Sequence, residues 1–154
     1  MRVATFIFRW RFMKKKAVIH IESIVEELDD AGLTESSDKT TSSAIGTLEL
    51  NAERAVIAYS ETTENATSDA EIIISDSEIT VKRSGSSQYE FTFIEGKSTK
   101  SLYTVAPYSF DTEIYTRKIR KSFDECGGEI SLIYDMTIGG AKKKTRMKIR
   151  VSEK

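Results

Sequence analysis

The sequence predicts an all-β fold, a single antiparallel meander of about 8–10 strands that closes into a barrel. Apolar and polar residues alternate along most of the 154-residue chain, which is the pattern of strands with one buried face. No segment shows the longer apolar period of an amphipathic helix, and Pro107 is the only proline. Short polar breaks separate the alternating segments. The connections are therefore expected to be hairpins, and closure would remove exposed sheet edges.

The C-terminal segment contains the clearest hairpin. Apolar residues alternate up to Ile138, Gly139-Gly140 follows, and cations then alternate with other residues from Lys142 onward. A Gly-Gly pair supplies the two positive φ angles of a type I′ turn. Pairing Ile138 with Ala141 brings apolar side chains opposite apolar ones and acids opposite cations. The predicted pairs are Leu132 with Met147, Ile130 with Ile149, Tyr134 with Thr145, Asp135 with Lys144 and Glu129 with Arg150.

The remaining strands follow from the same alternation. The first is expected at 17–27, and an acidic loop at 29–38 separates it from the second. Polar residues at 63–69 are expected to break the chain again, and tight turns separate most of the later segments. The strands predicted after the first are 41–50, 55–62, 70–75, 78–84, 89–95, 98–105, 109–122, 129–138 and 141–152.

A second hairpin predicts a polar cluster inside the barrel. With Asp76-Ser77 as its turn, Ala70 lies opposite Arg83 on the apolar face. Tyr59 and Glu61 share the apolar face of their own strand, because they alternate with its inward residues. An isolated charge on that face would be costly. We therefore predict that Arg83 and Glu61 pair, or lie in one hydrogen-bonded network with Tyr59.

Several short motifs stand in an order and spacing that are specific when taken together. They are Tyr59-Ser60-Glu61, Arg83-Ser84-Gly85, Phe93-Ile94-Glu95-Gly96 followed by Thr99 and Tyr103, Pro107-Tyr108, and the closing hairpin with Tyr134. In this combination the chain resembles the YwiB-like bacterial proteins, a family of unknown function, from about Met13 to Val151. The resemblance implies a lipocalin-like (calycin) barrel in a bacterial cytoplasm and brings no known reaction. One turn departs from the family pattern, since Ala106 and Ser109 replace a threonine and a glycine.

Charge and composition indicate one domain with a basic N-terminal extension. Residues 1–12 are basic and aromatic, and we expect them to be a poorly ordered extension of a barrel domain at 13–154. The apolar run within them is too short for a membrane span. The net charge of −1 combines an acidic stretch at 17–79 with basic stretches on either side. That polarity fits either a binding patch or acidic strands beside basic ones. Cys126 is the only cysteine, so no internal disulfide forms, and a cytoplasmic location fits.

The barrel interior is the first candidate site. An eight-to-ten-stranded barrel is wide enough to be filled by side chains or to hold one small molecule. Tyrosines, hydroxyls and one charged pair would line an interior suited to an amphipathic or anionic ligand. Two interpretations remain open at this point: these groups bind a ligand, or they satisfy one another and fill the barrel. The candidate ligand-binding residues are Tyr59, Glu61, Arg83, Thr99, Tyr103, Tyr134 and Thr145.

The C-terminal basic strand is the alternative site. Its outward cations could follow a phosphate backbone and make the protein a nucleic-acid or protein interaction module. The residues concerned are Lys142, Lys144, Arg146, Lys148 and Arg150. We expect no enzyme, cofactor or metal site, because no catalytic constellation and no zinc, calcium or phosphate-loop spacing is recognisable. His20, the single histidine, alternates with Ile19 and Ile21 and is expected to face outward.

Overall fold

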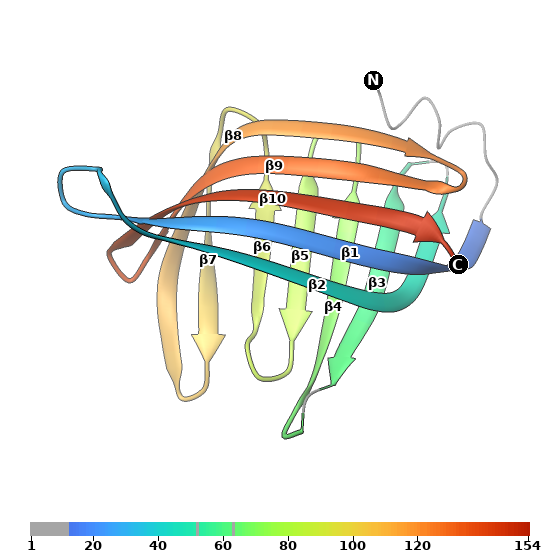
Figure 1. Cartoon of the computed structure of the whole chain (residues 1–154), viewed down its shortest axis with the longest axis horizontal. Helices are drawn as coiled ribbons and strands as arrows, with labels where there is room; N and C mark the ends of the chain where they lie inside the picture. The colour runs from blue at the N-terminus through green and yellow to red at the C-terminus, as the bar shows by residue number, and fades with distance from the viewer. Residues whose placement is uncertain (1–12, 52, 63) are drawn as a thin grey trace.

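Ten antiparallel strands form one sheet that curls into a nearly closed barrel (Figure 1). The computed structural model describes residues 13–51, 53–62 and 64–154; the predicted extension at 1–12 lies outside them. No helix occurs among these residues, and none there is long and apolar enough to cross a membrane. The strands are β1 (Met13–Leu28), β2 (Thr34–Leu50), β3 (Ala55–Thr62), β4 (Thr67–Ile74), β5 (Ile79–Ser84), β6 (Tyr89–Phe93), β7 (Ser98–Val105), β8 (Tyr108–Asp124), β9 (Gly127–Ile138) and β10 (Ala141–Glu153).

The two hairpin registers predicted from the sequence are confirmed. In β9–β10, Leu132 pairs with Met147 and Tyr134 with Thr145, as expected. Gly139 and Gly140 have φ angles of 53° and 88°, which are the two positive values that the turn requires. In β4–β5, Ala70 pairs with Arg83, again as predicted. Hydrophobic patterning therefore determined the face on which each of these side chains lies.

The sheet order is β6-β5-β4-β3-β2-β1-β10-β9-β8-β7, so the last strand lies against the first. The two ends of this order, β6 and β7, meet at a seam without a ladder. A single bridge joins Gln88 to Thr104, and the Thr99 hydroxyl donates to the Thr92 carbonyl at 2.6 Å. At the seam, the hydrogen bonds are therefore this bridge and the Thr99 bond, whereas ladders join neighbouring strands in the rest of the barrel.

Inward residues from every strand form one apolar core. Leu48, Ile57, Ile72, Phe93 and Ile149 are each at most 1% exposed. Burying an aliphatic or aromatic side chain of this size contributes roughly 1.5–3 kcal/mol. This core occupies the interior of the barrel and includes Phe91 and Phe93 of β6.

Three predicted boundaries differ from the structure by three residues or more. β1 begins at Met13 rather than at 17, and β4 begins at Thr67 inside the expected break. The acidic segment 29–38 is a loop only as far as Leu33, because β2 already begins at Thr34. Thr34–Ser43 is exposed on both faces and still pairs with β1. Backbone hydrogen bonds to β1, rather than burial of side chains, keep this segment of β2 in the strand conformation.

Candidate functional site

Arg83 and Glu61 meet at the end of the barrel formed by the β3–β4, β5–β6 and β7–β8 turns. Their Nη2 and Oε1 atoms lie 3.2 Å apart, so the predicted ion pair is confirmed. The two side chains are 21% and 37% exposed, which makes the pair more open to solvent than the sequence indicated. Burial alone would lower the pKa of Arg83. Tyr89, Glu61 and Tyr59 outweigh that effect and raise it, so the guanidinium stays charged.

Small residues make room for this pair. Across the sheet, Arg83 on β5 lies opposite Ala70 on β4, Ala70 lies opposite Tyr59 on β3, and Tyr59 lies opposite Gly46 on β2. Because Ala70 is short, the guanidinium can extend over it towards Glu61, two strands away. Because Gly46 has no Cβ, the Tyr59 Cβ lies only 2.8 Å from the position that one would occupy. Large and small side chains thus alternate across β2–β5.

Tyr89 is the residue at this site that sequence reasoning missed. It lies opposite Arg83 on β6 and stacks on Phe91 and Tyr103, with ring centroids 4.1 and 5.7 Å apart. Burial raises the pKa of Tyr89 and of Tyr59, although the nearby Arg83 charge acts in the opposite direction. Tyr89 alternates with Phe91 and Phe93. This pattern, together with the pairing of β5 and β6, would have identified Tyr89 as an inward residue beside Arg83.

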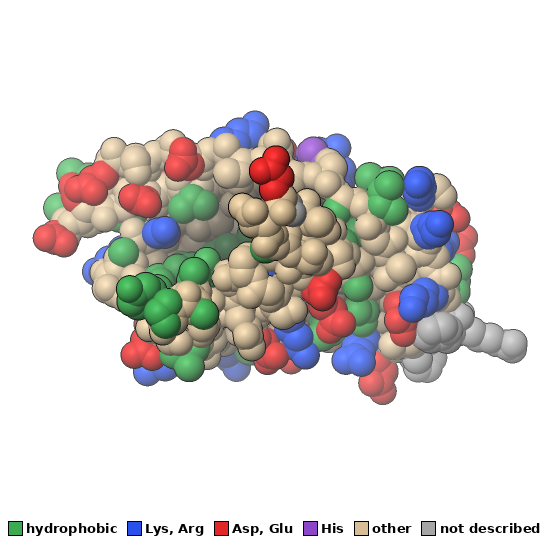
Figure 2. Space-filling model, turned by 90° about the horizontal axis from the view of Figure 1, so that it is seen from below, with side chains coloured by type: hydrophobic (Ala, Val, Ile, Leu, Met, Phe, Trp, Pro, Cys, Tyr) green, Lys and Arg blue, Asp and Glu red, His purple; other side chains and the backbone are tan. Residues whose placement is uncertain are grey.

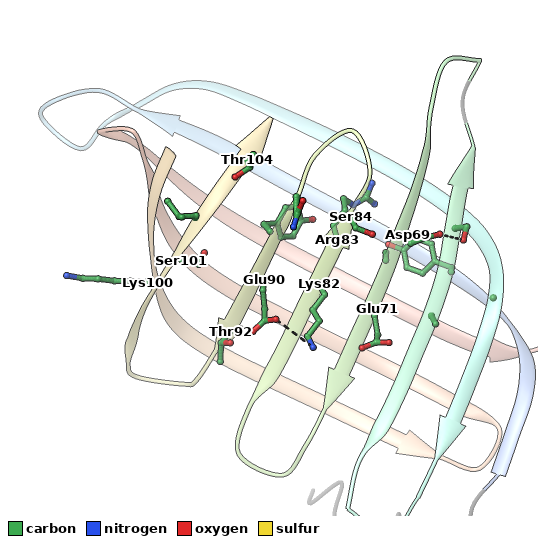
Figure 3. Close-up of a pocket in the computed structure, with 18 of the residues that line it drawn as sticks. Asp69, Glu71, Lys82, Arg83, Ser84, Glu90, Thr92, Lys100, Ser101 and Thr104 are labelled. Carbon is green, nitrogen blue, oxygen red and sulfur yellow. Dashed lines mark hydrogen bonds and ion pairs between the residues drawn. The ribbon is translucent and has the colours of Figure 1, made fainter. Parts of the chain in front are cut away.

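An open hollow of about 1130 Å³ borders this cluster. Tyr59, Arg83, Tyr89 and Ser101 reach it, but most of its charged lining lies on the opposite face of the strands from the core. In Figure 3, Glu71, Lys82 and Glu90 stand side by side on β4, β5 and β6, and a dashed line joins Lys82 to Glu90, which are 3.7 Å apart. The hollow is therefore open to solvent, unlike the enclosed lumen that the sequence suggested. Its charged lining is Asp69, Glu71, Lys82, Arg83, Glu90 and Lys100.

The same end of the barrel carries exposed apolar side chains. Figure 2 views the molecule from this end and shows a depression with hydrophobic side chains on one rim and acidic ones on the other. Val105, Tyr108 and Phe110 of the β7–β8 hairpin are 40%, 66% and 38% exposed. In β7 and β8 they share a face with Tyr103, since Tyr103 pairs with Phe110 and Val105 with Tyr108. The aromatic side of the site thus continues outward to the rim.

The other predicted site residues lie elsewhere. Tyr134 is 4% exposed, and its ring lies 4.8 Å from that of Phe93. Burial raises the pKa of Tyr134, although the nearby Thr145 hydroxyl acts in the opposite direction. Neither residue borders the hollow, so this part of the barrel is filled. Thr99 holds the β6–β7 seam. The structure thus separates the predicted set into an open cluster around Arg83 and a closed interior around Tyr134.

The basic strand is less neutralised than the sequence suggested. Glu129 lies 3.7 Å from Lys148 and 3.8 Å from Arg150. Glu22 of β1 lies opposite Lys148 in register, but its carboxylate binds Lys39 on β2 at 2.9 Å. Asp135 faces Lys144 in register, but its carboxylate binds Arg117 of β8 at 2.6 Å. Among the described residues, no carboxylate lies within ion-pair distance of Lys142, Lys144 or Arg146.

Groups suited to metal or nucleophilic chemistry are dispersed. In the described part of the chain, no three His, Cys, Asp or Glu side chains gather in a way that could hold a metal ion. Cys126 is free and exposed, and its backbone N–H donates to the Asp124 carboxylate at 2.8 Å. His20 places Nδ1 2.8 Å from the Ser43 hydroxyl on the neighbouring strand. The Arg83 cluster brings together a cation, a carboxylate and aromatic rings.

Comparisons with known proteins agree with this fold. The family described as domain of unknown function (DUF1934) matches residues 19–150. The uncharacterized β-barrel protein YwiB of Bacillus subtilis is 26% identical over 121 residues, which cover 79% of this chain and 81% of that protein. The crystal structure of the Bacillus subtilis ywiB protein superposes with a TM-score of 0.79 at 23% identity and covers 92% of this chain and 93% of that one. The structural likeness shows the same barrel.

Proposed function

Because this chain belongs to the DUF1934 family, a domain of unknown function, its role has to come from its own site, and we propose that it is a non-enzymatic barrel that binds a small amphipathic molecule at the Arg83 end. The observation that carries the proposal is a half-buried guanidinium that faces a hollow with a single carboxylate partner. A guanidinium has five N–H donors, so a bound carboxylate, phosphate or sulfonate group can share it with Glu61.

The aromatic stack supports an amphipathic ligand. Tyr89, Phe91 and Tyr103 lie nearly parallel, with interplanar angles of 15–18°. Tyr89 and Tyr103 are only partly buried, so one side of this stack can receive a flat apolar group. Pockets for small molecules typically combine an apolar wall with a few placed polar groups. A ligand with an acidic head beside Arg83 and an apolar body towards the exposed β7–β8 rim would use both.

A suitable probe is 8-anilinonaphthalene-1-sulfonate, which has one anionic group and flat apolar rings. We expect saturable fluorescence enhancement with one probe per chain, and an affinity about tenfold lower in Arg83→Gln, which corresponds to roughly 1.4 kcal/mol. Tyr89→Leu should also weaken binding. Lys142→Gln, which removes an exposed cation on the other surface, is the matched control and should bind like the wild type.

The proposal fails if the folded protein shows no saturable enhancement, or if Arg83→Gln and Lys142→Gln bind the probe equally well. Circular dichroism and cooperative urea unfolding of each variant exclude probe binding to a partly unfolded chain. Native mass spectrometry of protein purified from its own host then supplies the natural ligand's mass.

A further inference from the structure

The outer face of β8, β9, β10 and β1 is separate from the Arg83 site, and both β8 and β10 contribute cations to it. The register places Lys118 of β8 across Ile133 from Arg146 of β10. It places Arg120 across Ser131 from Lys148 in the same way. Strands two apart are separated by roughly 10 Å, and side chains on one face of a strand recur about every 7 Å. Figure 1 shows β8, β9, β10 and β1 side by side, so these four cations form one row on β8 and a parallel row on β10.

Most of this charge is not neutralised within the protein. Within the described ranges, Lys118, Arg120, Lys142, Lys144 and Arg146 have no carboxylate at ion-pair distance. All five side chains are exposed or partly exposed. Of the acids on this face, Glu22, Asp135 and Glu129 are bound to Lys39, Arg117 and Lys148. Glu26 of β1 lies opposite Lys144, and Glu113 of β8 lies across Thr137 from Lys142. Cations still outnumber acids on this surface, although the whole chain has a net charge of −1.

Apolar and aromatic groups lie among these cations. Tyr115 on β8 is 38% exposed, and the Arg117 guanidinium lies 5.6 Å from its ring centroid. The Asp135 carboxylate accepts hydrogen bonds from Arg117 Nε and Nη2 at 2.9 and 2.6 Å and so holds that guanidinium against the ring. A shallow depression of about 280 Å³ lies nearby. The residues that line it include Ile24, Ile133, Arg146, Lys148 and Glu22.

We propose that this face binds single-stranded nucleic acid, with the β8 and β10 cations on the phosphates and Tyr115 and the Ile24–Ile133 depression beneath the bases. A single strand offers both charged phosphates and unstacked bases, and proteins that bind it combine basic grooves with stacking rings. A duplex would engage only the cations, because its bases are already stacked. The mixture of cations, an exposed ring and an apolar depression therefore favours the single strand.

The test is fluorescence anisotropy with a labelled twelve-nucleotide oligouridylate at several salt concentrations. The double variant Lys118→Gln/Arg120→Gln should lose at least tenfold in affinity at low salt. Its slope of log affinity against log salt should fall by roughly 1.4, about 0.7 for each lost phosphate contact. Tyr115→Leu should weaken binding and leave the slope unchanged, because stacking releases no counterions. The matched control is Lys97→Gln/Arg54→Gln, which removes two exposed loop cations and should change nothing.

Three outcomes overturn the proposal: no binding of the oligouridylate at low salt, an equal loss in the control variant, or equal affinity for a duplex with no effect of Tyr115→Leu. The last outcome would show that this face binds any polyanion and has no preference for a single strand. Arg83→Gln should bind the oligouridylate like the wild type, so failure here and failure of ligand binding at the Arg83 end are distinguishable.

Discussion

At the scale of single residues, the site depends on one small side chain as much as on the charged ones. Ala70 separates Arg83 from Tyr59 along the row that crosses β5, β4 and β3. A longer residue there would fill the space through which the guanidinium reaches Glu61. The geometry of the ion pair is therefore set partly by a residue that makes no polar contact of its own.

The Arg83–Glu61 pair predicts coupled but moderate stability effects. Because the two side chains are 21% and 37% exposed, solvent screens part of the charge, and we expect Arg83→Ala and Glu61→Ala each to cost roughly 1–2 kcal/mol in free energy of unfolding. The double variant should cost less than the sum by at least about 0.5 kcal/mol. Urea titration measures all three. Lys142→Ala, an unpaired surface change, should stay within about 0.5 kcal/mol. Additive effects would mean that the pair does not persist in solution.

At the scale of strands, a bulge explains why the basic residues of β8 were not predicted as part of a surface. The β8–β9 register shifts between Thr116 and Lys118. Before the shift Ile114 and Thr116 face inward, and after it Ile119 and Phe123 do. One extra residue reverses the alternation, so Lys118 and Arg120 face outward beside β10. Period-two patterning cannot locate such a shift without knowing the partner strand, whereas in the unbulged β9–β10 hairpin it gave every register correctly.

The first half of β2, which pairs with β1, shows a second limit of predicting strands from the alternation of apolar and polar residues. Thr34–Ser43 is polar on both faces, and a polar run without alternation is typical of a loop. The continuous ladder with β1 makes it a strand, and a ladder of backbone hydrogen bonds leaves little sign in the side chains. Tyr89 was missed for a related reason, since its role depends on the β5–β6 pairing across a connection that lacks a two-residue turn signal.

Gly46 on β2 provides a stability test at this scale. A Cβ there would lie 2.0 Å from the Ala58 carbonyl oxygen and 2.8 Å from the Tyr59 Cβ, so β2 and β3 would have to separate. Gly46→Ala should therefore cost roughly 3 kcal/mol in free energy of unfolding, measured by urea titration. Gly32→Ala is the matched control: it has open space around it and a φ of 82°, and should cost only about 1–2 kcal/mol. Equal losses would show that β2 can move away from β3.

At the scale of the whole molecule, the hydrogen bonds between strands are unevenly distributed around the barrel. β1 and β10 lie in the middle of the sheet order, each with a ladder on both sides. β6 and β7 have a ladder on one side only and share a single bridge. The Arg83 cluster and the open hollow both adjoin that seam. The part of the barrel with the fewest hydrogen bonds between strands is therefore the part where we propose that a ligand binds.

Native-state hydrogen exchange should reveal this asymmetry. Gln88 and Thr104 exchange backbone hydrogen bonds across the seam at 2.8 and 2.9 Å, and residues two apart on a strand direct their backbone groups to the same side. The amides of Glu90 and Leu102 thus point into the seam without a ladder partner, and we expect them to exchange through local opening far below the global free energy of unfolding. The amides of Ile149 and Val151 in β10 should exchange only by global unfolding. If Glu90 and Leu102 were protected as strongly as Ile149, the seam would be paired in solution, and a ligand at the Arg83 end would have to enter without opening it.

If they are weakly protected, addition of the anilinonaphthalene sulfonate probe should slow the exchange of the Glu90 and Leu102 amides and leave that of Ile149 unchanged. The reason is that the probe binds beside the seam and stabilises its closed form.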